Sequence, residues 1–166
     1  MKDQKRIAFK QLFDENSKKV FNLCFGYTGD SDTANDLMQE TFIKVWQNLD
    51  KFRNQSQLST WIYRIAVNTC LSHLRSAKRK PTEELNDYII ENHTEEYSEK
   101  SEQIAALYRA IAKLEENERL IITMVLDEIP YPEIAEISGI SEGNLRVRIH
   151  RIKHKLTEIY NRNERD

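Results

Sequence analysis

The sequence predicts an all-α protein made of two small helical domains. Apolar residues recur at three- and four-residue spacing, and no stretch shows the alternation that is typical of a β-strand. Only four Gly and three Pro interrupt the 166 residues, so few turns are expected. A chain of this length suits one ordinary domain or two small ones. A segment rich in Glu divides the chain, which favours two domains.

The acidic segment, residues 81–101, is predicted to be an extended linker. It opens with Pro81 and contains Lys100 as its one formal positive charge. Its acidic side chains repel one another and its apolar pattern is weak, which is typical of a solvated tether. We therefore expect helical domains over residues 1–80 and 102–160. The formal net charge of −2 hides this asymmetry, because the basic residues gather on either side of the linker.

The first domain is expected to contain three helical segments. The earliest, a helix or helix pair, has an apolar stripe and ends near Gly29, a suitable C-terminal cap. The stripe consists of Phe9, Leu12, Phe13, Val20, Leu23, Cys24 and Tyr27. The second helix follows at residues 32–49, with Ser31 or Asp32 as its N-cap. Four polar side chains of this helix lie largely off its apolar stripe and are free to meet a partner: Asp36, Gln39, Glu40 and Lys44.

The third helix, residues 57–79, is apolar almost all round in its first half. Such a helix is either sandwiched in a core or waiting for a partner. At about 100° per residue, Arg64, Asn68 and Arg75 fall on one narrow strip, with Ser72 and Arg79 beside it. A strip of hydrogen-bond donors that ends in cations suits a phosphate backbone and base edges.

The second domain ends in the pattern of a helix-turn-helix. Pro132 falls in the first turn of a short helix, where its missing N–H costs nothing, and Gly139 can take the positive φ of the turn. Ser141 is a fitting N-cap for the second helix, which begins at Glu142.

The second helix of this motif separates packing residues from candidate DNA readers. Its predicted core face lies on one line and consists of Leu145, Ile149, Ile152, Leu156 and Ile159. A helix in the major groove reads base edges from its N-terminal part, so we predict base contacts by Asn144, Val147, Arg148 and Arg151. Arg146 and Lys153 suit phosphates, and Gly143 lets the two backbones approach. The alternative, a merely solvated basic face, is less favoured because the cations follow a helix-turn-helix turn.

Other classes of protein find little support. Cys24 and Cys70 have no Cys-x-x-Cys pairing and no His at ligand spacing, so we expect two small buried side chains, no metal site and no disulfide. The four histidines pair with no nucleophile, and no glycine-rich phosphate loop is present, so we expect no enzyme and no cofactor. The chain shows neither a signal peptide nor a membrane span, so we expect a cytoplasmic protein without membrane insertion.

Three segments in order, "DLMQETFIKVW", "STWIYRIAVNTCLSHLR" and "EIAEISGISEGNLRVRIHRIKHKL", resemble the bacterial extracytoplasmic-function sigma factors. The resemblance covers nearly the whole chain. It implies a sigma region 2 domain and a sigma region 4 domain, joined by a linker, that bind RNA polymerase core and direct promoter-specific initiation. It also implies an anti-sigma factor that clamps both domains, and a linker that either threads a basic channel of the polymerase or is a simple tether.

The resemblance assigns roles to the candidate residues. One segment of the second helix matches the part of the family that docks on the clamp helices of the polymerase β′ subunit, and its matching residues are Asp36, Leu37, Gln39, Glu40, Phe42 and Trp46. We add Lys44 to this surface because it lies off the apolar stripe of that helix. We also expect contact with the β subunit. The third helix matches the part that recognises and melts the downstream promoter element, with Trp61, Arg64, Asn68, Arg75 and Arg79 as candidate contacts to single-stranded DNA. The loop at residues 50–59 is where a flipped base would be held.

The helix-turn-helix matches the part that reads the upstream element as double-stranded DNA. The sequence departs from the family pattern at Glu115, where Pro is frequent, and at Ser72, where Asp is usual. Pro130 and Pro132 are further departures and stiffen the entry to the motif. The alternative function is a polymerase-independent helix-turn-helix regulator. It would need a receiver, ligand pocket or dimerisation helix in place of the first domain, and the sequence offers none.

Overall fold

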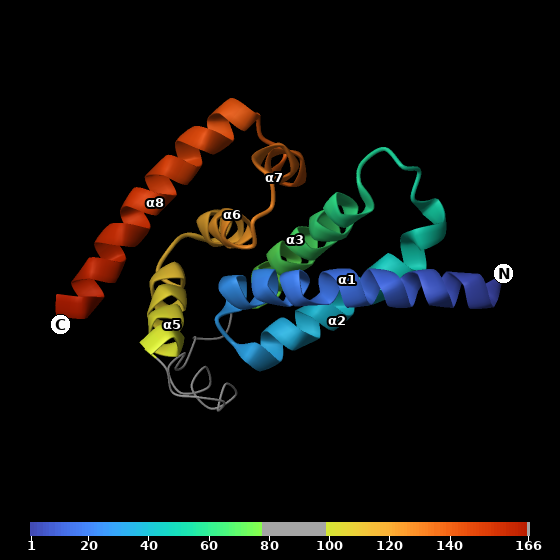
Figure 1. The fold of residues 1–166 in the computed structure, drawn as a ribbon, viewed down its shortest axis with the longest axis horizontal. Coiled ribbons are helices and arrows are strands. Elements are labelled where there is room, and N and C mark those ends of the chain that lie inside the picture. Colours follow the sequence, from blue (N-terminus) through green and yellow to red (C-terminus); the bar gives the residue numbers. More distant parts are fainter. Residues whose placement is uncertain (78–98, 166) are drawn as a thin grey trace.

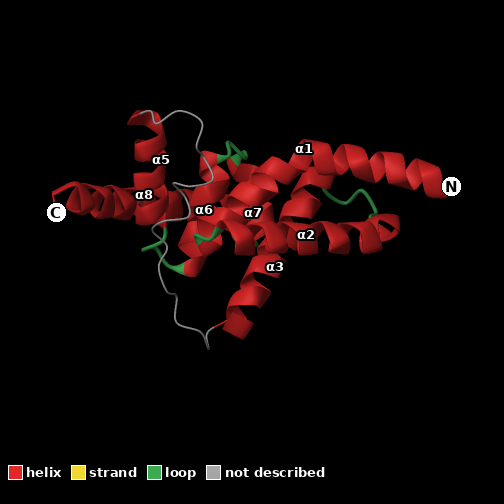
Figure 2. Cartoon of the chain, turned by 90° about the horizontal axis from the view of Figure 1, so that it is seen from below, coloured by secondary structure: helices red, strands yellow, loops and turns green. Residues whose placement is uncertain are grey.

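A computed structural model describes residues 1–77 and 99–165, and these residues form helices joined by short loops (Figures 1 and 2). No strand occurs in either described range. The elements are α1 (Lys2–Thr28), α2 (Ser31–Asn48), the 3-10 helix η1 (Leu49–Lys51), α3 (Leu58–Ala77), α5 (Glu99–Ile111), α6 (Glu116–Leu126), α7 (Tyr131–Ser138) and α8 (Glu142–Arg165). The predicted all-α fold is confirmed. Residues 81–98 of the expected linker lie outside the described residues, while residues 99–101 already belong to α5.

The helices α1 and α2 form a tight antiparallel pair with well-defined caps. α1 is a single helix, and Gly29 ends it with φ 69°, its N–H donating to the Phe25 carbonyl at 2.7 Å, as expected for a left-handed C-cap. The N-cap of α2 is Asp30, whose carboxylate accepts from the Thr33 backbone N–H at 3.0 Å. The prediction of Ser31 or Asp32 as this cap was wrong, because the helix begins one residue earlier than the apolar pattern indicated.

The helix α3 is sandwiched, which resolves the choice that its sequence left open. One side of it packs on α1 and α2, and another side packs on α7 of the second half of the chain. Ile62, Ala66 and Cys70 are fully buried, and Tyr63 is nearly so. The apolar circumference of α3 therefore reflects two neighbours within the same chain.

The second half of the chain places α6 and α7 across the α1–α3 pair, with α8 running along the outside (Figure 1). Glu115, one of the departures from the family pattern named above, is the N-cap of α6, and its backbone N–H donates to the Glu118 carboxylate at 3.1 Å, as in a capping box. Glu118 also accepts a hydrogen bond from Lys155 of α8 at 3.0 Å. The departure from the family pattern is thus compensated by a side-chain cap.

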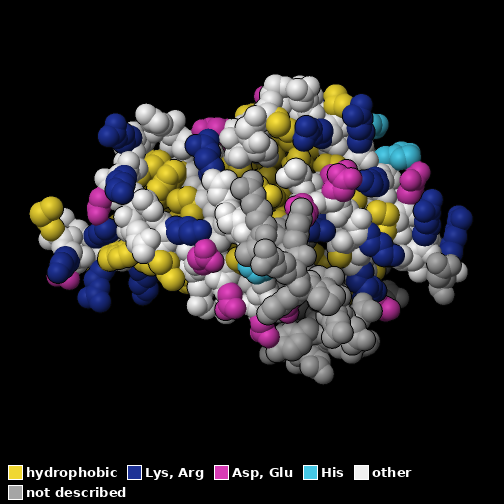
Figure 3. Space-filling view, turned by 180° about the vertical axis from the view of Figure 1, so that it is seen from behind, with side chains coloured by type: hydrophobic (Ala, Val, Ile, Leu, Met, Phe, Trp, Pro, Cys, Tyr) yellow, Lys and Arg dark blue, Asp and Glu magenta, His cyan; other side chains and the backbone are white. Residues whose placement is uncertain are grey.

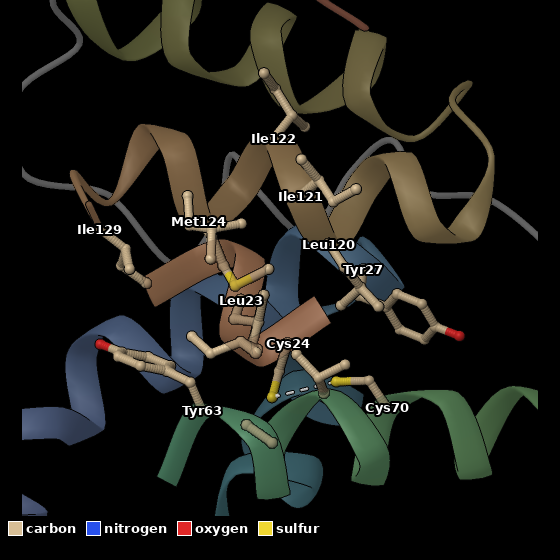
Figure 4. Packing of buried hydrophobic residues seen from close by; sticks show 14 of the residues in the cluster. Leu23, Cys24, Tyr27, Tyr63, Cys70, Leu120, Ile121, Ile122, Met124 and Ile129 are labelled. Atoms are coloured by element: carbon tan, nitrogen blue, oxygen red, sulfur yellow. Dashed lines mark hydrogen bonds between the residues drawn. The ribbon is translucent and has the colours of Figure 1, made fainter. Parts of the chain in front are cut away.

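One hydrophobic core runs through both halves of the chain (Figure 4). Leu23 and Tyr27 of α1 lie in the same cluster as Leu120 and Met124 of α6 and Tyr63 of α3. This continuity follows from the direct packing of α6 on α1. The two predicted domains are therefore in intimate contact in this structure.

Both cysteines lie in that core, as expected. Cys24 and Cys70 are free and fully buried, and their Sγ atoms are 3.8 Å apart. The hydrogen-bond contact with the Cys24 sulfur, together with burial, raises the pKa of the Cys70 thiol, so it stays protonated and acts as an apolar packing group. Across the two described ranges, no helix combines the length and the hydropathy needed to cross a bilayer.

A half-buried carboxylate, Asp127, stands where the two halves meet. Burial raises its pKa above the ordinary value, while the hydrogen bond that Asn22 donates to Oδ1 at 3.1 Å and the positive charges of Lys19 and Lys18 lower it in part. Its second oxygen, Oδ2, is buried and has no hydrogen-bond partner. The charged form is therefore poorly compensated at neutral pH.

We expect Asp127→Asn to raise the free energy of unfolding at pH 7, because the amide removes a poorly compensated charge. The folded-state pKa of Asp127 lies above the unfolded one, so the charge destabilises the folded chain at neutral pH, and this loss disappears as the pH falls through the folded-state pKa. Urea unfolding at pH 7 and pH 5 measures the difference between variant and wild type, which should shrink at pH 5. If variant and wild type differed by the same free energy of unfolding at both pH values, the raised pKa assigned to Asp127 would be contradicted.

Candidate nucleic-acid interface

The helix-turn-helix has the predicted geometry at its turn. Gly139 follows α7 with φ 70°, and nothing lies within 4 Å of a Cβ built on it, so only the backbone conformation requires glycine there. The Ser141 hydroxyl accepts from the Asn144 backbone N–H at 3.2 Å and caps α8, as expected. Ile140 packs against the core beside this turn.

The two faces of α8 are separated as the sequence predicted. Leu145, Ile149, Ile152 and Leu156 are buried against the core, and Ile159 packs at its edge. The predicted readers all lie on the exposed side: Gly143, Asn144, Val147, Arg148 and Arg151. A side chain added at Gly143 would meet nothing within 4 Å, which leaves this part of the helix open to another backbone. Val147 is a large apolar side chain with half of its surface exposed (50 %), which suits contact with a thymine methyl group.

Arg146, predicted to contact phosphate, is held by two neighbours. Its guanidinium pairs with Glu142 at 2.8 Å, one turn earlier on α8, and lies over the Tyr131 ring of α7 at 5.1 Å. These contacts fix the side chain between the two helices of the motif. Figure 3 shows Lys, Arg and His side chains at the end of the molecule that α8 forms, with acidic side chains among them, and further Lys and Arg side chains at the N-terminal end.

The structure describes only part of the polar strip that was predicted on α3. Asn68 and Ser72 are exposed, and Arg64 is half-buried, so these three positions form the outward edge predicted for the helix. Arg64 is engaged by α7: it donates to the Glu136 backbone carbonyl at 3.3 Å and pairs with the Glu136 carboxylate at 3.5 Å. The side chain of Arg75 and the whole of Arg79 lie outside the described residues.

An open pocket of about 360 Å³ lies between α2, η1 and α3. Its lining combines cations, amides and one aromatic ring, namely Lys44, Asn48, Lys51, Trp61, Ile65, Asn68, Thr69 and Ser72. The Trp61 ring is braced by Phe52 from the preceding loop, with ring centroids 5.2 Å apart. This composition suits an unstacked base with its phosphate, because the ring offers a stacking surface and the lysines offer positive charge.

The pocket contains residues that the sequence analysis did not assign to nucleic acid. Lys44 was placed on the polymerase-docking surface, yet its Nζ donates to Thr69 of α3 at 3.2 Å and lines the pocket. Asn48 and Lys51 were not singled out at all. A signal did exist, because residues 44, 48 and 51 follow helical spacing and mark one polar edge of α2 that continues into η1.

The residues predicted for docking on α2 differ in exposure. Asp36, Gln39 and Glu40 are exposed, and Glu40 pairs with Lys44 at 3.0 Å. Leu37 is only 2 % exposed, because its side chain packs in the core on the apolar stripe of the helix. Phe42 is also buried. Trp46 is exposed at the edge of α2, where Phe9 packs against its ring.

No group of three or more His, Cys, Asp and Glu side chains in the described part of the chain could hold a metal ion. The arrangement consists of binding surfaces: a basic helix that follows a tight turn, and an amide-lined and cation-lined pocket beside an aromatic ring.

Solved structures share this arrangement of helices. The chain superimposes on the sigma factor RpoE of Bartonella quintana, in complex with the anti-sigma factor NepR, with a TM-score of 0.78 and 23 % identity, over 93 % of this chain and 97 % of that one. It superimposes on CnrH, in complex with the cytosolic domain of CnrY, with a TM-score of 0.72 and 21 % identity, over 94 % of this chain and 89 % of that one. These likenesses establish a shared fold.

Sequence comparisons establish the family. Residues 12–80 match the model for Sigma-70 region 2, and residues 104–156 match that for Sigma-70, region 4. The chain is 32 % identical to the ECF RNA polymerase sigma factor SigW of Bacillus subtilis, over 90 % of this chain and 87 % of that protein. It is 36 % identical to the ECF RNA polymerase sigma-E factor of Escherichia coli K12, over 93 % of this chain and 86 % of that protein. This chain therefore belongs to the ECF sigma factors of RNA polymerase, where ECF stands for extracytoplasmic function.

Proposed function

We propose that this sigma factor divides promoter recognition between its two halves. Region 4 reads the upstream element as duplex DNA through α8. Region 2 uses α3 and the adjoining pocket to capture the downstream element while that element melts. The observation that carries this proposal is the two-sided α8, which buries Leu145 and Ile149 while it presents Asn144, Arg148 and Arg151 to solvent. Helix-turn-helix proteins place such a face in the major groove.

Melting of the downstream element requires that unstacked bases be held. Unstacking costs a few kcal/mol per base, and stacking of a base on an aromatic side chain returns about 1–3 kcal/mol. Trp61 supplies a ring at the pocket, Asn68 supplies donors and acceptors for a base edge, and Lys44 and Lys51 supply charge for the phosphate. The loop before α3 supports this site through Phe52. In this proposal the pocket, and not the loop alone, holds the flipped base.

Docking on the polymerase is assigned to the exposed side of α2. Asp36, Gln39 and Glu40 form an uninterrupted polar edge on that helix. The resemblance of this segment to the family's docking motif supports contact with the clamp helices of the β′ subunit, with further contact to the β subunit. The protein then acts by binding, and the polymerase performs the chemistry.

We also infer regulation by an anti-sigma factor. Two solved structures that share this fold contain a bound partner: RpoE is in complex with the anti-sigma factor NepR, and CnrH is in complex with the cytosolic domain of CnrY. Size-exclusion chromatography of this chain with the product of a neighbouring reading frame tests the inference. A stable complex that suppresses transcription supports it.

Run-off transcription is the direct test of the proposed function. Bacterial core polymerase transcribes fragmented genomic DNA with and without this protein, and new start sites are mapped. Start sites that depend on the protein and share two short elements support the proposal and define the promoter. Binding of duplex DNA without any new start site would instead support the alternative, a polymerase-independent helix-turn-helix regulator.

We expect Glu40→Arg to weaken binding of core polymerase by about tenfold or more, because a charge reversal replaces attraction by repulsion at a contact surface. Glu40 is exposed, and its ion pair with Lys44 is a surface pair, so the fold should remain intact. Fluorescence anisotropy of a labelled protein titrated with core polymerase measures the affinity.

Asp14→Arg is the matched control, because it reverses one exposed carboxylate on α1 instead of α2. The control should bind core polymerase as the wild type does. Equal affinity of Glu40→Arg and wild type would remove Glu40 from the docking surface.

A further inference from the structure

The N-terminal end of α1 is strongly basic. Its first ten residues carry four cations, Lys2, Lys5, Arg6 and Lys10, and one carboxylate, Asp3. The side chains of Lys2, Arg6 and Lys10 are exposed, and none of the three forms an ion pair within the described part of the chain. Figure 3 shows Lys and Arg side chains around this end of the molecule. We call Lys2, Arg6 and Lys10 the basic row.

The needs of the helix do not explain the basic row. The positive end of the helix dipole lies at the N-terminus and favours carboxylates there, so cations in the first turns of α1 work against it. The N-cap, Met1, makes no side-chain hydrogen bond that would offset this cost. Residues four positions apart lie on one side of a helix, so the three cations form a continuous row. Charges that a helix does not favour indicate a role outside it.

Lys5 ties this end of α1 to the pocket of region 2. Its Nζ pairs with Oδ2 of Asp50 in η1 at 2.5 Å and lies over the Trp46 ring at 4.6 Å. The next residue after Asp50 is Lys51, which lines the pocket. The ion pair also neutralises Asp50, so Lys51 and Arg53 remain as exposed cations of the segment that leads to α3. The basic end of α1 and one wall of the pocket are therefore neighbours.

The charge balance of these two neighbours is positive. Residues 1–13 and 49–57 together contain six cations and two carboxylates, and Lys5 already pairs with one of the two. At 1.5 Å per residue, the basic row is about 12 Å long, a length over which a stacked DNA strand places three or four phosphates. A row of exposed cations at this spacing suits a phosphate backbone and carries no means of reading bases.

We propose that the basic row holds the phosphate backbone of the DNA strand whose base enters the pocket. Lys2, Arg6 and Lys10 then extend the region 2 interface from the flipped base to the nucleotides beside it. This inference rests on the proposed function, because it needs a strand in the pocket. The contact is electrostatic and independent of base sequence, so it adds affinity and register to the open strand and leaves base preference to the pocket and to α8.

The salt dependence of DNA binding tests the proposal. The probe is a fork-junction DNA taken from a start site mapped by run-off transcription, with its downstream element single-stranded. Fluorescence anisotropy measures its affinity for holoenzyme that contains the wild type or Arg6→Ala with Lys10→Ala, at a series of salt concentrations. We expect the slope of log affinity against log salt concentration to fall in magnitude by about 0.7 for each lost contact, about 1.4 in total. The loss should be the same for every base at the flipped position.

Two control variants separate local contact from overall charge. Lys18→Ala with Lys19→Ala removes two exposed cations from the other half of α1, so it changes the net charge equally and should keep the wild-type slope. Arg6→Lys with Lys10→Arg keeps both charges of the basic row and should also keep the slope. Circular dichroism verifies that each variant is folded.

An unchanged slope in Arg6→Ala with Lys10→Ala would overturn the proposal. It would also be overturned if this variant assembled less holoenzyme with core polymerase but bound the fork normally once assembled, since the basic row would then face an acidic surface of the polymerase. If the wild type produced no start site at all, the proposed function itself would fail. A normal wild type with an unchanged variant rejects the role of the basic row alone.

Discussion

Replacement of Leu145 by alanine should lower the free energy of unfolding of region 4 by about 2–5 kcal/mol. Leu145 is fully buried (0 % exposed) at the start of α8, where it packs in the core beneath the turn at Gly139. Its removal leaves a cavity that close-packed neighbours can fill only in part. Because α8 carries the upstream readers, we also expect weaker binding of upstream-element duplex. Urea denaturation followed by circular dichroism measures the loss.

Val147→Ala is the control on the same helix. Val147 lies two residues further on and is half exposed, so its replacement should change stability by less than about 0.5 kcal/mol. A loss below about 1 kcal/mol for Leu145→Ala would mean that the start of α8 is not anchored in the core, and the division of its faces would then have to be abandoned.

Replacement of Arg148 by alanine should weaken binding of the upstream element by about 1–3 kcal/mol and relax the preference for one base pair. Arg148 is exposed on the outward face of α8, near the helix N-terminus that enters the groove. Unlike Arg146, whose guanidinium is held by Glu142 and Tyr131, it is in position to turn toward a base edge. Titration of duplexes that carry single substitutions measures both affinity and preference.

Arg162→Ala is the matched control, because it removes an exposed arginine from the far end of the same helix. It should leave the base preference unchanged. If Arg148→Ala lost the same affinity for every duplex, Arg148 would be reassigned to a phosphate contact. In that case the slope of log affinity against log salt concentration would fall in magnitude by about one.

Much of the fold follows from the sequence because helical periodicity is a local property. The stripe of α1, the core face of α8 and the glycine caps at Gly29 and Gly139 were all predicted from spacing and residue type. The cap of α2 was misplaced by one or two residues, because Asp30, Ser31 and Asp32 are all chemically suitable. Spacing alone cannot decide which of several good caps the backbone uses.

The site was predictable where it lies on one helix and less so where several elements meet. The reader face of α8 is a property of one periodic segment, and every residue predicted for it is exposed. The pocket joins α2, η1 and α3, so the sequence did not indicate that Lys44 lines it or that Asn48 and Lys51 lie beside it. Both facts concern which neighbour a side chain meets.

The sequence by itself determined the helical class, the glycine caps at Gly29 and Gly139, the helix-turn-helix and the family. Local spacing and residue chemistry suffice for these. Only the tertiary structure decided what covers the second apolar side of α3, how closely Gly26 of α1 approaches Thr123 of α6, and that Arg64 is bound by Glu136. These facts depend on contacts between residues that are 72 to 97 positions apart in the chain, since Arg64 pairs with Glu136 and Gly26 meets Thr123. No periodic pattern records such contacts, because they arise only when one helix packs on another.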